Sequence, residues 1–146
     1  MSIHKHRGNF TWENIDVLKY KQDGTHFKDI TRQTLFPGAP ELPSELRYFE
    51  ILPGGHSTLE RHKHLHLVMA IRGRGQVLLG NEIMGLETLD VISIPALTWH
   101  QFQADRSETL GFLCLVSSER DRPQRPNARE LVELKRLPAV AKFIKV

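Results

Sequence analysis

Short runs of strand-forming residues, separated by turn residues, fill the middle of the chain from Leu46 to Val116. Apolar and β-branched residues dominate runs such as HLVMAI, QVLLG and VISIP, and glycine, proline or asparagine residues separate them. Closely spaced short strands with turn signals between them are typical of an antiparallel sandwich or barrel. The sequence therefore predicts an all-β fold built from a curled antiparallel sheet.

The segments on either side of this region have a different composition. Residues 1–44 mix polar and aromatic residues and end in FPGAPELPSE, whose prolines and glycine disfavour a helix or an inner strand. We expect residues 1–44 to form an N-terminal arm and loop that packs on a barrel at 45–117. In the C-terminal tail, 118–146, Asn127 and Glu130 have the spacing of a capping box. One short helix that ends before Pro138 is predicted there.

The overall composition limits the classes of protein to consider. A chain of 146 residues with 40% hydrophobic residues fits one soluble domain. Cys114 is the only cysteine, so no internal disulfide can form, and we expect a small buried side chain in a cytoplasmic protein. No apolar run approaches the roughly 18 residues of a membrane span, and the basic tail lacks the patterns of a nucleic-acid binder. Neither a membrane nor a nucleic acid is therefore expected as a partner.

Histidine is concentrated in one short stretch, HSTLERHKHLH, which contains four of the eight histidines. Glu60, His62, His64 and His66 occupy alternate positions, so an extended segment would direct all four side chains to the same side. Several neutral imidazoles and a carboxylate that converge in this way suit a divalent transition metal. His56 follows two glycines in a turn, and we do not count it among the ligands.

A further histidine, His100, follows a proline-marked turn in DVISIPALTWHQF. A strand order that returns His100 to the first cluster would close a four-ligand site, although spacing alone is equally compatible with a structural histidine. The stretch PGGHSTLERHKHLHLVMAIRGRG and the later NEIMGLETLDVISIPALTWHQF together resemble the two motifs of the cupin superfamily. This resemblance covers about residues 46–116. It implies an RmlC-like jelly-roll barrel, a double-stranded β-helix, with a metal in its mouth.

Carried over by position, the resemblance implies one divalent metal ion (zinc, iron, manganese or nickel) held by Glu60, His62, His66 and His100. The slot that is commonly histidine holds Glu60 here, and the slot that is commonly glutamate holds His66. A register shifted by two residues would use His64 in place of Glu60. We prefer Glu60, because the four residues from His62 to His66 leave room for a turn between strands. His64 is then expected beside the site.

The expected cavity wall is largely apolar and is formed by Tyr48, Val68, Ala70, Thr98 and Phe102. Such a wall favours a small, largely apolar oxygenated compound (aromatic, enol or keto) over a phosphate. The leading hypothesis is a metal-dependent enzyme with dioxygenase or cyclase/isomerase chemistry, as in several small cupins. The alternative is a ligand-binding or regulatory cupin whose metal is structural.

The predicted strand HLVMAI is apolar on both faces. Leu67, Met69 and Ile71 share one face, and Val68 and Ala70 share the other. The outer face of a barrel strand is normally wet, so something must cover this one. We expect a homodimer, or failing that the N-terminal arm laid over this face.

Overall fold

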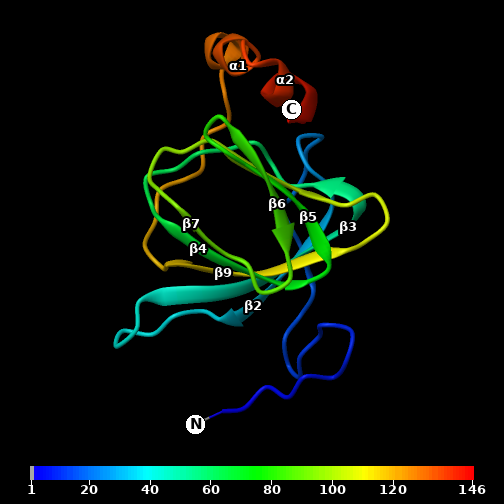
Figure 1. The fold of residues 1–146 in the computed structure, drawn as a ribbon. Coiled ribbons are helices and arrows are strands. Elements are labelled where there is room, and N and C mark those ends of the chain that lie inside the picture. Colours follow the sequence, from blue (N-terminus) through cyan, green and yellow to red (C-terminus); the bar gives the residue numbers. More distant parts are fainter. Residues whose placement is uncertain (1) are drawn as a thin grey trace.

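The computed structural model describes residues 2–146, which form a curled antiparallel sheet with two short helices beyond one end (Figure 1). The sheet order is β6-β5-β8-β3-β9-β4-β7, with β2 paired to β3 and β1 paired to β2. The predicted all-β barrel is confirmed. Within residues 2–146 the strands are β1 (Leu18–Lys19), β2 (Lys28–Phe36), β3 (Ser44–His56), β4 (His66–Arg72), β5 (Arg74–Leu79), β6 (Glu82–Glu87), β7 (Val91–Ile94), β8 (His100–Ala104) and β9 (Leu110–Ser117).

Alternation along the strands separates the inside of the barrel from the outside. On β9, Phe112 and Cys114 are buried, whereas Leu113 and Leu115, which alternate with them, are more exposed. Side chains of one strand point alternately to the two faces of a sheet, so this pattern places an apolar core inside the curl. The core takes residues from β2, β3, β4, β5, β6, β7, β8 and β9. It fills one part of the interior and leaves another part open.

The C-terminal tail forms two helices, α1 (Ala128–Leu134) and α2 (Pro138–Phe143), where one was predicted. The expected cap is present: the Asn127 side chain accepts from the Glu130 N–H, and the Glu130 carboxylate accepts from the Asn127 N–H. Pro138 begins a helix instead of only ending one, because the first helical position needs no N–H donor. None of the helices in residues 2–146 is long and apolar enough to cross a membrane.

The N-terminal segment both lies on the barrel and extends the sheet. Besides supplying β1 and β2, it places Phe10 and Trp12 against Tyr48, with ring centroids 5.6 and 5.4 Å apart. The arm thus covers the outer face of β3. It leaves Leu67 and Leu115 on neighbouring strands each 39% exposed. Dimerisation through this remaining apolar face stays a prediction.

Candidate functional site

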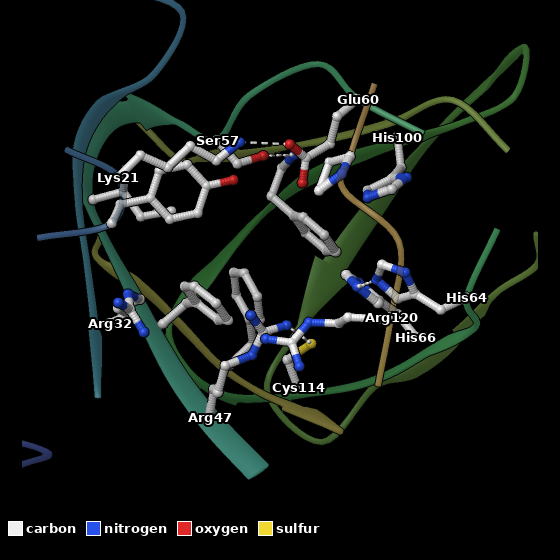
Figure 2. Close-up of a pocket in the computed structure, with 16 residues that line it drawn as sticks. Lys21, Arg32, Arg47, Ser57, Glu60, His64, His66, His100, Cys114 and Arg120 are labelled. Atoms are coloured by element: carbon white, nitrogen blue, oxygen red, sulfur yellow. Dashed lines mark hydrogen bonds and ion pairs between the residues drawn. The ribbon is translucent and has the colours of Figure 1, made fainter. Parts of the chain in front are cut away.

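A pocket of about 260 Å³ opens inside the barrel (Figure 2). Its lining has three chemical characters. Imidazoles lie at one side (Figure 2), and phenylalanines and cationic side chains form much of the remaining lining. The main groups are His64, His66 and His100; Phe49, Phe102 and Phe112; Lys21, Arg32, Arg47 and Arg120; and the Cys114 thiol.

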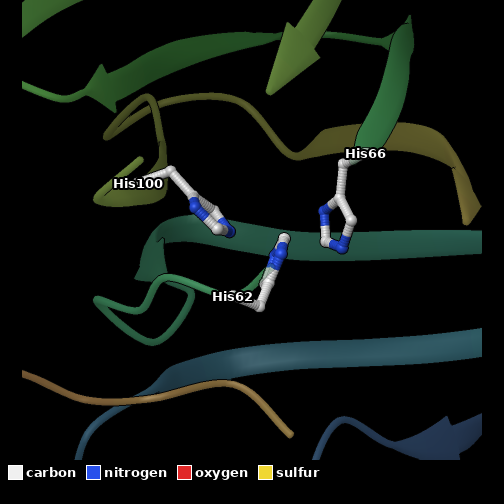
Figure 3. Close-up of side chains that lie close together, drawn as sticks. All are labelled: His62, His66 and His100. Atoms are coloured by element: carbon white, nitrogen blue, oxygen red, sulfur yellow. The ribbon is translucent and has the colours of Figure 1, made fainter. Parts of the chain in front are cut away.

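Beside this pocket the structure brings three buried histidines together: His62, His66 and His100 (Figure 3). Their candidate ligand nitrogens all lie within 4.8 Å of one another. His66 begins β4 and His100 begins β8, while His62 lies in the connection between β3 and β4. Backbone hydrogen bonds between Glu60 and His100, of 3.1 and 3.0 Å, hold that connection against the start of β8. Strand ends that meet at one edge of the barrel therefore create the histidine group.

Hydrogen bonds to the backbone fix which ring nitrogens of this group are free. His62 Nδ1 lies 2.7 Å from the His64 carbonyl oxygen, and His100 Nδ1 lies 2.9 Å from the Thr98 carbonyl oxygen. A carbonyl can only accept, so both Nδ1 atoms carry the hydrogen and both Nε2 atoms present a lone pair. His62 Nε2 is buried and makes no hydrogen bond with the described residues. A metal ion would satisfy this nitrogen, and neutral imidazoles are suitable ligands for a divalent transition metal.

Burial keeps these imidazoles neutral. Desolvation, with a contribution from His100, lowers the pKa of His62 to about 4. Burial also lowers the pKa values of His66 and His100. Since the neutral imidazole is the metal-binding form, the group is ready to bind a metal at neutral pH.

Acid is expected to destabilise the metal-free protein. The unfolded chain binds protons at His62 below its ordinary pKa of 6.5, whereas the folded chain does so only near pH 4. The free energy of unfolding therefore has its full value above the unfolded pKa and decreases as the pH falls through this window. Thermal melts of chelator-treated protein at about pH 7.5 and about pH 5 should show a Tm several degrees lower in acid. His62→Gln should reduce that difference, and an equal difference in both proteins would contradict the account.

His64 lies against the histidine group. Its ring stacks on that of His62 with centroids 3.7 Å apart, and its Nε2 is 3.1 Å from His66 Nε2. Its Nδ1 lies 2.8 Å from Asp121 Oδ1. The carboxylate accepts the Nδ1 hydrogen, so the Nε2 lone pair of His64 faces His66. The same carboxylate accepts from the backbone N–H groups of Lys63 and His64, which fixes the turn.

Glu60 lies in the pocket but outside the group of three histidines. Its Oε2 accepts a hydrogen bond from Lys21 Nζ at 2.6 Å, and Lys21 also donates to Thr58 Oγ1 at 3.0 Å. Because Glu60 is buried, the ammonium group of Lys21 compensates its charge. Metal ligation by Glu60 stays a prediction.

Asp121→Ala is expected to weaken metal binding by about 10- to 100-fold, because the variant loses the acceptor that orients His64. Competition with a chromogenic chelator at neutral pH measures this affinity. Asp105→Ala is the matched control, since that carboxylate also anchors a turn, by accepting from Ser107, and lies outside the pocket. Equal affinities in the two variants would show that Asp121 does not act on the metal centre.

The expected wall residues have different places in the structure. Phe102 lines the pocket, Val68 and Ala70 are buried in the adjoining core, and Thr98 holds His100 through its carbonyl oxygen. Tyr48 requires a correction, because it lies under the N-terminal arm and not in the pocket. The reason is its position on β3, which alternates with the pocket-lining Arg47 and Phe49.

The cationic side chains and Cys114 are pocket residues that the sequence analysis missed. Arg47 and Cys114 are direct partners across β3 and β9, and an Arg47 terminal nitrogen donates to Cys114 Sγ at 3.4 Å. Burial raises the pKa of the Cys114 thiol, while Arg47 acts to lower it. The pocket lining is therefore less apolar than expected, and it also offers charge partners for an anion. An arginine within the apolar run LRYFEIL was the available signal.

Comparisons with known proteins agree on the family. The cupin domain family matches residues 47–116. The 1-methylthio-D-xylulose 5-phosphate methylsulfurylase of Rhodospirillum rubrum is 47% identical over 139 residues, which cover 94% of this chain and 88% of that protein. A cupin 2 conserved barrel domain protein from Rhodopseudomonas palustris is 46% identical, with a TM-score of 0.94 over 99% of this chain and 100% of its own. A cupin-2 domain structure from Rhodospirillum rubrum is also 46% identical, with a TM-score of 0.87 over 94% and 93% of the two chains.

Proposed function

The chain belongs to the cupin family, and we propose that it is a metal-dependent enzyme that transfers the methylsulfanyl group of a 1-methylthio ketose phosphate to a thiol. The name of the Rhodospirillum rubrum relative describes an activity of this kind. The observation that carries the proposal is the position of Cys114. This thiol lies in the same pocket as the imidazoles His64, His66 and His100, and among cationic side chains. A sulfur acceptor, candidate metal ligands and partners for a phosphate thus share one cavity.

In the proposed step, Cys114 Sγ attacks the sulfur of the methylthio group. The S–S bond forms as the C1–S bond breaks, and the electron pair of the broken bond stays on C1, next to the C2 carbonyl. C1 then takes up a proton, which balances the proton lost by the thiol. The carbon is reduced and the two sulfurs are oxidised, so no external oxidant is needed. The products are a 1-deoxy ketose phosphate and a methyl disulfide on Cys114.

A second thiol then completes the turnover. Its attack on the Cys114 disulfide releases an alkyl methyl disulfide and returns Cys114 to the thiol form. Arg47 supports both halves of the cycle, because its N–H group donates to Sγ and stabilises the thiolate over the thiol. This contact offsets part of the opposing effect of burial on the pKa of Cys114.

We propose His62, His66 and His100 as metal ligands, with His64 in preference to Glu60 as the fourth. The contact between the Nε2 atoms of His64 and His66, and the hold of Asp121 on His64, support this set. When bound, a divalent zinc, iron, manganese or nickel ion would supply Lewis-acid polarisation of a substrate oxygen. Polarisation of the C2 carbonyl would favour cleavage of the C1–S bond. Dioxygenase, cyclase or isomerase chemistry would leave the thiol in the pocket without a role.

Incubation with 1-methylthio-D-xylulose 5-phosphate and dithiothreitol tests this function. Nuclear magnetic resonance of metal-loaded reactions should show loss of the methylthio ketose and formation of the 1-deoxy ketose phosphate. Treatment with a chelator should stop the reaction, and added metal should restore it. A product that keeps its methylthio group would indicate an isomerase or cyclase instead. Binding without any product would favour the regulatory alternative, and either result would overturn the proposal.

A further inference from the structure

Two arginines share the inner face of the β2–β3 pair. Arg32 is the register partner of Phe49, and Thr34 is the register partner of Arg47. Arg32 and Arg47 are therefore diagonal neighbours on one face, a relation that places two residues about 7–8 Å apart, with their Cβ atoms somewhat closer. Both side chains line the pocket, on the side away from His66 and His100 (Figure 2). Two guanidinium groups at this spacing can approach one tetrahedral anion from two sides.

Both guanidinium groups have unused donors. Among residues 2–146, the side-chain hydrogen bond found for Arg32 is one from Nε to the Lys19 carbonyl oxygen, at 3.3 Å, so its two terminal nitrogens are free to donate. Arg47 Nε is buried and makes no hydrogen bond with the described residues, although it lies 3.4 Å from Glu45 Oε1 in an ion pair. A buried N–H group without a hydrogen bond is costly, and an anion placed in line with it would supply one. The Arg47 guanidinium also lies over the Phe49 ring, 4.9 Å from its centroid, which restrains its orientation.

The charges around the pocket favour an anion. Four cationic side chains line it: Lys21, Arg32, Arg47 and Arg120. Two carboxylates pair with them. Glu60 binds Lys21, and Glu45 lies 3.4 Å from Arg47 and 3.2 Å from Arg120. The four cationic side chains thus outnumber the two carboxylates that pair with them. A phosphate monoester carries about −1.5 to −2 at neutral pH, and arginine pairs with phosphate through two parallel N–H groups.

We infer that Arg32 and Arg47 bind the phosphate of the substrate and select for phosphorylated ketoses, an inference that rests on the proposed function. The order in which imidazoles, thiol and arginines line the pocket matches the order of functional groups along a short-chain ketose phosphate. The imidazoles lie at one end (Figure 2), Cys114 is the register partner of Arg47, and Arg32 is the register partner of Phe49. A ketose whose carbonyl end faces the imidazoles then directs its phosphate to the guanidinium groups. Arg32 acts on the phosphate alone, whereas Arg47 contacts both the phosphate and Cys114.

Arg32→Gln tests the site through binding, without turnover. The probes for isothermal titration calorimetry are D-xylulose 5-phosphate and D-xylulose, neither of which carries a methylthio group. We expect Arg32→Gln to weaken binding of the phosphorylated sugar by about 10- to 100-fold and to leave binding of D-xylulose unchanged. Arg32→Lys keeps the charge but lacks the planar guanidinium group. Its affinity for D-xylulose 5-phosphate should lie between those of the parent protein and Arg32→Gln. Arg74→Gln, a half-exposed arginine outside the pocket, is the matched control.

Unchanged affinity of Arg32→Gln for D-xylulose 5-phosphate would overturn the inference, and so would an equal loss for both sugars. A thermal melt of each variant checks that the fold is retained. Failure of the phosphate site and failure of the proposed reaction give different results. Binding that depends on Arg32, without methylsulfanyl transfer, would retain the phosphate site and reject the reaction. Transfer with the same KM and kcat in Arg32→Gln as in the parent protein would retain the reaction and reject the phosphate site.

Discussion

Cys114→Ser lowers the rate of methylsulfanyl transfer by at least about 10³-fold in the proposed reaction, because a serine hydroxyl is a far weaker nucleophile toward sulfur than a thiolate. The substitution is nearly isosteric, and Cys114 is buried between β3 and β4 in the sheet. Neither the barrel nor the histidine group should change. Single-turnover kinetics with 1-methylthio-D-xylulose 5-phosphate measure the effect.

Two controls separate chemistry from folding in this experiment. The metal content and Tm of Cys114→Ser should equal those of the parent protein. Within the described residues, the hydrogen bonds of His62, His64, His66 and His100 do not involve the thiol. Binding of D-xylulose 5-phosphate should also be retained. If Cys114→Ser transferred the methylsulfanyl group at the parent rate, Cys114 would not be the acceptor.

His62→Ala is expected to lose most of its bound metal and to reduce the transfer rate to that of chelator-treated protein. His62 is 1% exposed, and its free Nε2 lies within the group that also contains His66 and His100. Removal of one ligand from such a set leaves a site that competes poorly with water and buffer for the ion. Elemental analysis of the purified variant measures the metal content.

His56→Ala is the control for this experiment. His56 comes from the same histidine-rich stretch, but its Nδ1 bonds to the Ser57 carbonyl oxygen and it lies outside the histidine group. It should keep the metal content of the parent protein. Parent-level metal in both His62→Ala and His100→Ala would place the metal elsewhere. Because His62→Ala also leaves a buried cavity, His62→Gln serves as a second variant that fills more of the space.

The sequence was sufficient to predict the barrel because its strands alternate with turn signals throughout the central region. The ligand set stays a prediction, and local periodicity could not decide between Glu60 and His64. The turn expected between His62 and His66 is a bend at residues 63–64. Side-chain alternation does not continue through a bend, so Glu60 meets Lys21, and His64 folds back onto His62. Local periodicity predicts directions only within a strand.

Other site residues come from distant parts of the chain. Lys21 lies between β1 and β2, and Arg120 and Asp121 follow β9, in segments interpreted as an arm and a tail. Their arrival at the pocket depends on how these segments cross the mouth of the barrel, as in the backbone bridge between Arg61 and Gln124. No local pattern encodes such a crossing. By contrast, the sequence does predict that Arg47 and Tyr48 point to opposite faces of β3, once it is known which face of the strand lies inside the barrel.

The mass of the intact protein after a single turnover, without added thiol, tests the central claim most directly. The account predicts that the parent protein gains the mass of one methylsulfanyl group in place of one hydrogen. Peptide analysis should place the gain on Cys114, and dithiothreitol should reverse it. Formation of the 1-deoxy ketose phosphate with Cys114 unmodified would contradict the account.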